Sequence, residues 1–201
     1  MSNVMPQVPQ PSARPFLRVL TLWLLAAAAL GTSGRIAQLQ PPLPQVVIVV
    51  LTAALIVAGV LHAGFHTWLA QVTLRGVVAF HVVRFVGVAF LLLYAKGQLP
   101  FQFAVPGGWG DIAVATLALG IVLLIPKPET QPRLLMVWNA LGLADIVGVV
   151  LSAARCALHD PGSMRALLVF PMSLVPTFLV PLVIASHVLV FWRLRRNPWL
   201  S

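Results

Sequence analysis

Two charged residues interrupt long apolar stretches of the sequence, and the side chains of both can bind ions or exchange protons. Arg84 lies in the apolar segment 73–95, and Asp145 lies in the apolar segment 134–152. Each follows the start of its segment by about eleven residues, which is roughly 17 Å along a helix. Opposite charges at equal depth should pair, because either one alone in apolar surroundings would be far more costly. The pair could be a structural bridge between two helices or a site for an anion or a proton.

Four histidines form a second group of candidate ligands. His62 and His66 are spaced four residues apart, so they share one face of a predicted helix and fall in the same half of the bundle as His81 and His187. Imidazoles from two helices could bind a haem iron axially, and three could hold a transition metal. They could equally donate interhelical hydrogen bonds, so the cofactor stays open. Cys156 is the only cysteine, which excludes a cysteine-based metal site.

A segment rich in proline and glycine, residues 97–111, precedes the fourth apolar segment. It predicts a loop that dips against the bundle, with Asp111 capping the helix that follows. The alternative is an exposed carboxylate that binds a cation, or that acts with His159 in an intramembrane hydrolase. The glycines lack the Lys-Ser/Thr of a phosphate loop, so nucleotide binding is not indicated.

Three prolines punctuate the last apolar segment, at positions 171, 176 and 181. Each removes a backbone hydrogen bond and frees the carbonyl four residues earlier, so this helix must bend. Free carbonyls beside Thr177 and Ser173 could line a polar cavity, or the prolines could only shape the packing.

The elements that must position these residues are transmembrane helices. About 60% of the residues are apolar and only 8% are charged, so lipid is the solvent that suits the chain. The net charge of +9 does not indicate nucleic acid, because the basic residues are scattered at the ends of apolar runs. The sequence predicts an all-α bundle of six transmembrane helices, each long enough or nearly so to cross a bilayer. These are Phe16–Gly31, Gln45–Leu69, Thr73–Ala95, Trp109–Ile125, Leu134–Ser152 and Ala166–Trp192.

Lysine and arginine in the connections predict the orientation. One side would hold Arg14, Arg18, Arg75, Lys127, Arg133, Arg193, Arg195 and Arg196. The other would hold only Arg35, Lys96, Arg155 and Arg165. Both termini are therefore expected in the cytoplasm, with residues 1–15 a disordered tail, residues 16–192 the membrane domain and residues 193–201 a basic tail. The first segment could instead be a cleaved signal peptide, because Arg14 and Arg18 precede a short alanine-rich run.

Several motifs from the third segment onward resemble one family. They are Arg84-x-x-Gly87, the run from Phe103 through Pro106 to Gly110-Asp111, Trp138-Asn139-x-x-Gly142-x-x-Asp145, and Pro176-Thr177 followed by Pro181 and His187. The chain resembles a group of small bacterial multi-pass membrane proteins of uncharacterised function that share a Phe-Ala-x-Pro-Ala/Gly-Gly-x-Gly-Asp loop. This chain has Gly107 where alanine is expected. The resemblance implies a bacterial inner-membrane protein, and it places Arg84, Asp111, Asp145 and His187 inside recurring motifs.

The sequence leaves three functions open. The first is binding or translocation of a small solute or ion, with Arg84, Asp111, Asp145, Asn139 and Thr177 as the candidate binding residues. The second is a non-catalytic subunit of a respiratory or photosynthetic membrane complex, with other membrane subunits as partners. The third is a haem or metal protein that uses the four histidines. No nucleophile motif supports an enzyme.

Overall fold

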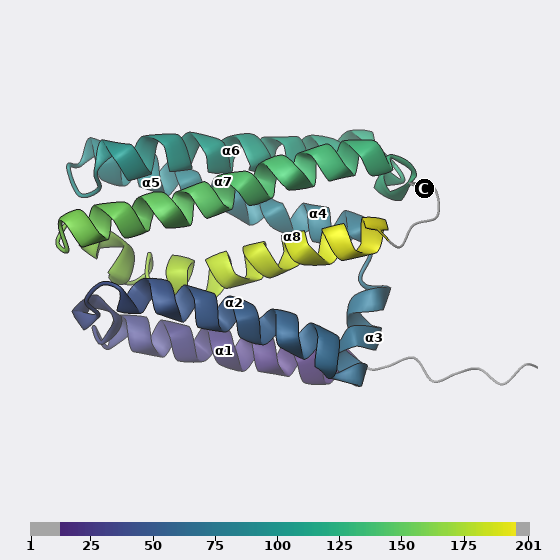
Figure 1. Cartoon of the computed structure of the whole chain (residues 1–201), viewed down its shortest axis with the longest axis horizontal. Coiled ribbons are helices and arrows are strands. Elements are labelled where there is room, and N and C mark those ends of the chain that lie inside the picture. The colour runs from purple at the N-terminus through teal and green to yellow at the C-terminus, as the bar shows by residue number, and fades with distance from the viewer. Residues whose placement is uncertain (1–12, 196–201) are drawn as a thin grey trace, which may run out of the picture.

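The computed structural model describes residues 13–195, which are all-α (Figure 1). Within this part of the chain, six helices are long and apolar enough to cross a membrane, so the predicted six spans are confirmed. Four are single helices: α1 (Arg14–Thr32), α2 (Leu43–Leu61), α6 (Phe101–Leu124) and α7 (Pro132–His159). The third span is composite, with α4 (Leu74–Phe80), a 3-10 stretch η2 (His81–Val86) and α5 (Gly87–Ala95). The sixth joins a π-helical turn η5 (Val175–Leu179) to α8 (Val180–Arg195). The expected tails fall mostly on residues 1–12 and 196–201, which lie outside the described residues.

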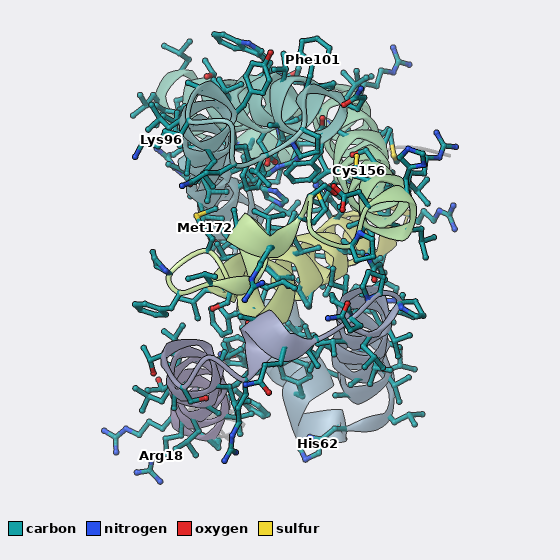
Figure 2. All side chains as sticks on the ribbon, turned by 90° about the vertical axis from the view of Figure 1, so that its left-hand side faces the viewer. Arg18, His62, Lys96, Phe101, Cys156 and Met172 are labelled. Atoms are coloured by element: carbon teal, nitrogen blue, oxygen red, sulfur yellow. The ribbon has the colours of Figure 1, made fainter. Side chains whose placement is uncertain are left out.

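The spans form two groups with the last span between them (Figures 1 and 2). Helices α4 to α7 pack together on one side, α1 and α2 lie on the other, and α8 contacts both α2 and α7. The first residues of α1 and the last of α8 lie at the same end of the bundle, called here the terminal end. The connections 33–42, 96–100 and 160–174 lie at the opposite end.

The second predicted helix is broken at His62, which corrects the expectation of one continuous segment. Helix α2 ends at Leu61, and a short helix α3 (Ala63–Gln71) then crosses the terminal end of the bundle (Figure 1). The break occurs because His62 is extended and its Nδ1 accepts the backbone N–H of Phe65 at 3.1 Å, which caps α3. His62 and His66 therefore do not share a face of one helix.

Arginine side chains fix the terminal end by capping helix C-termini. Arg193 of α8 donates to the carbonyls of Leu69, Ala70 and Val72, at the end of α3. Arg75 donates to Val122 at 2.7 Å, in the last turn of α6. A cation at a helix C-terminus satisfies free carbonyls and suits the helix dipole, so both contacts hold the ends of the elements in place.

The fourth span begins at Phe101 and not at Trp109, so the predicted loop 97–111 is helical from Phe101 onward. Pro106 is accommodated in the second turn, and the glycines that follow it, Gly107 and Gly108, are buried against neighbouring helices. Small residues allow such close helix packing in membranes, so these residues mark an interface and not a break. Asp111 consequently lies in the middle of α6, and its predicted role as a cap is wrong.

The last span is helical only from Val175 onward, so the predicted single helix over 166–192 is wrong in its first part. Residues 165–168 form a 3-10 turn (η4) and residues 169–173 form a bend and turns, and Pro171 within this stretch has no backbone N–H to donate. The carbonyl of Thr177, which Pro181 leaves free, accepts the indole N–H of Trp23 at 3.0 Å. Helix α1 therefore contributes the donor that the bent span lacks.

We expect Trp23→Phe to lower the free energy of unfolding by about 1 kcal/mol, because the Thr177 carbonyl loses its donor inside the bilayer. The measurement is the unfolding midpoint of the purified protein in detergent. Trp109→Phe is the matched control, because Trp109 is 61% exposed on the outside of the bundle. Equal effects of the two substitutions would contradict the assigned role of Trp23.

Candidate functional site

Arg84 lies at the centre of a buried polar site. It lies on η2, in the middle of the third span, and only 1% of the residue is exposed. Its Nε donates to Oδ1 of Asp111 at 2.6 Å, and its other two nitrogens donate to the Gly142 carbonyl at 2.9 Å and to Asp145. The predicted pairing of Arg84 with Asp145 is thus confirmed, and Asp111 joins it. We call these three residues the Arg84 cluster.

The cluster is assembled across three spans. Asp111 comes from α6, while Asp145 and Gly142 come from successive turns of α7. Asp145 can lie against α6 only because residue 110 is glycine, since a Cβ there would overlap its carboxylate oxygen Oδ1. The guanidinium thus binds in a geometry that close helix packing fixes in advance.

The charges of the Arg84 cluster do not balance. One guanidinium faces two carboxylates, so one negative charge is in excess when both are ionised. Only 3% of the Asp111 side chain is exposed, against 22% for Asp145. A cavity of about 20 Å³ adjoins Arg84 and Asp111, which is room for roughly one water molecule. The site can therefore accept a positive charge, and Asp145 is its more accessible carboxylate.

A second polar group, one helical turn from Arg84, joins His81 to His187. Both histidines are fully buried, and their ring centroids lie 4.3 Å apart. Nδ1 of His187 lies 2.8 Å from Oδ1 of Asn139, whose amide nitrogen donates to the His187 carbonyl at 3.0 Å. This fixes the amide orientation, so His187 carries its proton on Nδ1.

Ser186 contacts the other histidine of the pair. Its hydroxyl lies 2.7 Å from the Val183 carbonyl, to which it can donate, and 3.1 Å from Nε2 of His81. The remaining ring nitrogens, Nδ1 of His81 and Nε2 of His187, have no hydrogen-bond partner among the described residues. Gly142 contacts both groups. Its carbonyl accepts from Arg84, and its Cα packs so closely against His187 that a Cβ would lie 2.6 Å from Cε1 of that ring.

The four predicted histidine ligands do not come together. His62 is an exposed cap, and the ring of His66 packs edge-on against Trp192 with centroids 5.2 Å apart. Among residues 13–195, no group of three or more histidine, cysteine, aspartate or glutamate side chains could hold a metal ion. The 4.3 Å between His81 and His187 leaves no room for a porphyrin between their rings.

The other predicted site residues have separate partners. Asn139 orients His187, and the hydroxyl of Thr177 donates to the Ser173 carbonyl at 2.6 Å. The side-chain hydrogen bonds of Arg84 go to Asp111, Gly142 and Asp145 and to neither of these two residues. His159 is the exposed last residue of α7, roughly 21 Å along the helix from Asp145, so it does not meet the buried Asp111. The hydrolase pairing of Asp111 with His159 is therefore wrong.

The sequence offered Gly142 only as part of a motif and Ser186 not at all, and the position expected for Asp111 was wrong. A usable signal existed for two of them. Reading residues 101–124 as one span would have put Asp111 near mid-depth, and the spacing of Asn139, Gly142 and Asp145 places all three on one side of a helix. Nothing in the sequence distinguishes Ser186 from other serines in the chain.

The charge excess predicts strongly non-additive substitutions in the Arg84 cluster. Asp111→Asn or Asp145→Asn alone leaves Arg84 with one carboxylate, so we expect each to cost less than about 1.5 kcal/mol of unfolding free energy. The double substitution leaves the guanidinium with no carboxylate partner and should lower the free energy of unfolding by about 3–5 kcal/mol. Chemical unfolding of the four proteins measures the coupling, with Glu129→Gln as an exposed control. Additive effects would show that the two carboxylates act independently.

Comparison with known proteins places this arrangement in a family. No curated protein and no solved structure matches the chain. A domain of unknown function, DUF8737, matches residues 41–195, which include α2 to α8 and both polar groups but not α1. The chain therefore belongs to the DUF8737 family.

Proposed function

We propose that this membrane protein binds a small ion or solute of positive charge at the Arg84 cluster, and holds or translocates it within the bilayer. The observation that carries the proposal is that two carboxylates face one guanidinium in a buried site. A proton on one carboxylate would also restore neutrality, and it is the smallest cation of this class.

The distribution of acidic residues supports a functional and not merely structural cluster. The whole sequence has four acidic residues, and two of them contact Arg84. The other two, Glu129 and Asp160, lie in exposed connections. A bridge between helices needs only one carboxylate, while a second adds a desolvation cost of several kcal/mol with no charge to pair with. A bound cation removes that cost.

Charge movement tests this proposal for several cations at once. Purified protein in liposomes is adsorbed on a solid-supported membrane, and currents are recorded on jumps in proton, Na⁺ or methylammonium concentration. We expect a saturable current for at least one of these in the wild type. Asp111→Asn and Asp145→Asn should reduce it at least about tenfold, because the excess charge that attracts the cation is gone.

Glu129→Gln is the matched control, because it removes a carboxylate from an exposed connection and should leave the current unchanged. A wild type that gives neither a steady transport current nor a transient binding current with any of the three cations would overturn the proposal. So would a current that survives both cluster substitutions.

We also infer that the protein resides in a bacterial plasma membrane with its terminal end in the cytoplasm. The orientation is supported by the distribution of basic residues among the described residues. The opposite end has four, Arg35, Lys96, Arg155 and Arg165, whereas the terminal end has seven: Arg14, Arg18, Arg75, Lys127, Arg133, Arg193 and Arg195.

Single cysteines test this orientation. Glu129 lies just before α7 and Asp160 directly after it, so the two positions are at opposite ends of the bundle. In a Cys156→Ala background, an impermeant maleimide applied to intact cells should label Asp160→Cys but not Glu129→Cys. Permeabilised cells should label both. The reverse pattern in intact cells would invert the orientation.

A further inference from the structure

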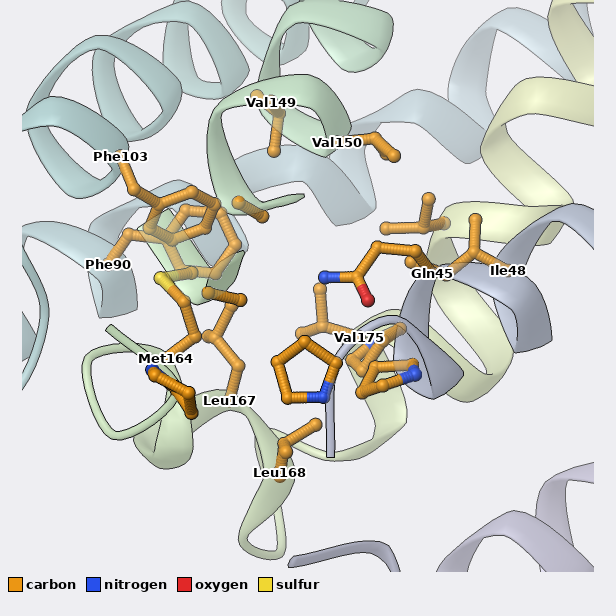
Figure 3. A pocket seen from close by; sticks show the side chains of 17 residues that line it. Gln45, Ile48, Phe90, Phe103, Val149, Val150, Met164, Leu167, Leu168 and Val175 are labelled. Atoms are coloured by element: carbon orange, nitrogen blue, oxygen red, sulfur yellow. The ribbon is translucent and has the colours of Figure 1, made fainter. Parts of the chain in front are cut away.

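A larger pocket lies at the opposite end of the bundle, between α2, α5, α6, α7 and the segment 161–168 (Figure 3). We call it the opposite-end pocket. Its cavity volume is about 60 Å³, and 17 residues line it, among them Gln45, Phe90, Phe103, Val149, Ala153 and Leu168. At roughly 10–15 Å³ per water-sized group, this volume suits about four to six non-hydrogen atoms.

The opposite-end pocket adjoins the cavity beside the Arg84 cluster. Four residues line both spaces: Phe90, Val149, Val175 and Val180. The smaller cavity in turn adjoins Arg84 and Asp111. A molecule in the pocket would therefore have its inner end toward Asp111, the more buried of the two carboxylates.

The lining of the opposite-end pocket is apolar with one exception. Gln45 is the only lining residue with a polar side chain, and its Oε1 has no hydrogen-bond partner within the described part of the chain. Figure 3 shows its amide among the lining side chains, opposite the rings of Phe90 and Phe103. The two rings pack with centroids 5.1 Å apart. Such a wall suits an alkyl or aryl group.

The geometry points to a primary organic ammonium ion with a short apolar body as the ligand, with the ammonium toward Asp111 and the apolar body in the opposite-end pocket. This inference rests on the proposed function and names its ligand class. An anion would meet the excess carboxylate, and an uncharged solute would leave that charge uncompensated. A hydrated inorganic ion would gain nothing from the apolar walls.

Chain length gives the test. In the same current assay, the half-saturating concentrations of methylammonium and n-butylammonium are compared, with n-butyrate as the anion of matched size. Three additional buried methylenes should lower the half-saturating concentration on the order of tenfold or more. Butyrate should give no saturable current.

Two variants assign the effect to the pocket. Ala153→Phe fills the opposite-end pocket away from the cluster, so the preference for n-butylammonium over methylammonium should fall to within about threefold. Val147→Phe is the control on the same helix, because Val147 is 41% exposed on its outer face. Leu168→Ala enlarges the pocket and should shift the preferred ligand to a longer alkylammonium. The methylammonium current reports that each variant is folded.

The outcomes separate this inference from the proposed function. If methylammonium or Na⁺ gives a saturable current but n-butylammonium is no better than methylammonium, the pocket assignment is wrong and the cation site stands. If the chain-length preference persists in Ala153→Phe with an intact methylammonium current, the apolar body binds elsewhere. If no cation gives a current, both proposals fall.

Discussion

The structure depends on a charged side chain that has no access to bulk water. Arg84 must satisfy its guanidinium inside the bundle, and the groups that do so come from α6 and α7. Three spans are consequently held at one depth by one residue, since a shift of any of them would break a charge-assisted hydrogen bond in apolar surroundings. These contacts therefore fix the geometry of the Arg84 cluster.

The same requirement for internal hydrogen bonds explains the rest of the bundle. Prolines bend the last span and free carbonyls, and the Thr177 carbonyl is taken up by Trp23 of α1. The pair of buried histidines is oriented by Asn139 and Ser186, which ties α8 to α7 and to the third span. In lipid no water can replace such partners, so irregular backbone survives only where a neighbouring helix supplies them. Helix α1 supplies one although it lies outside residues 41–195, where the family domain is found.

The sequence was sufficient for the spans and for the pairing of Arg84 with Asp145, because both follow from the cost of exposing charge or backbone to lipid. It was insufficient where local signals have two meanings. Proline and glycine at 106–108 read as a loop, yet in a membrane they also mark close helix packing, and this ambiguity hid Asp111 inside α6. The break at His62 depends on one side-chain cap, which an apolar pattern over 45–69 does not reveal. The partners of His187 could not be predicted, because they come from a different helix.

The two ends of the bundle differ in a way that bears on direction. At the terminal end, α3 crosses the spans, and Arg193 fastens it to α8 through three backbone carbonyls. At the opposite end, an apolar pocket shares four lining residues with the cavity beside Arg84 and Asp111. A protein that only binds its ligand from the opposite end would need no conformation other than this one. A carrier would also need a second conformation that opens the terminal end, in which α3 moves and the hydrogen bonds of Arg193 break. These hydrogen bonds would therefore stay intact in a binding protein and break in a carrier.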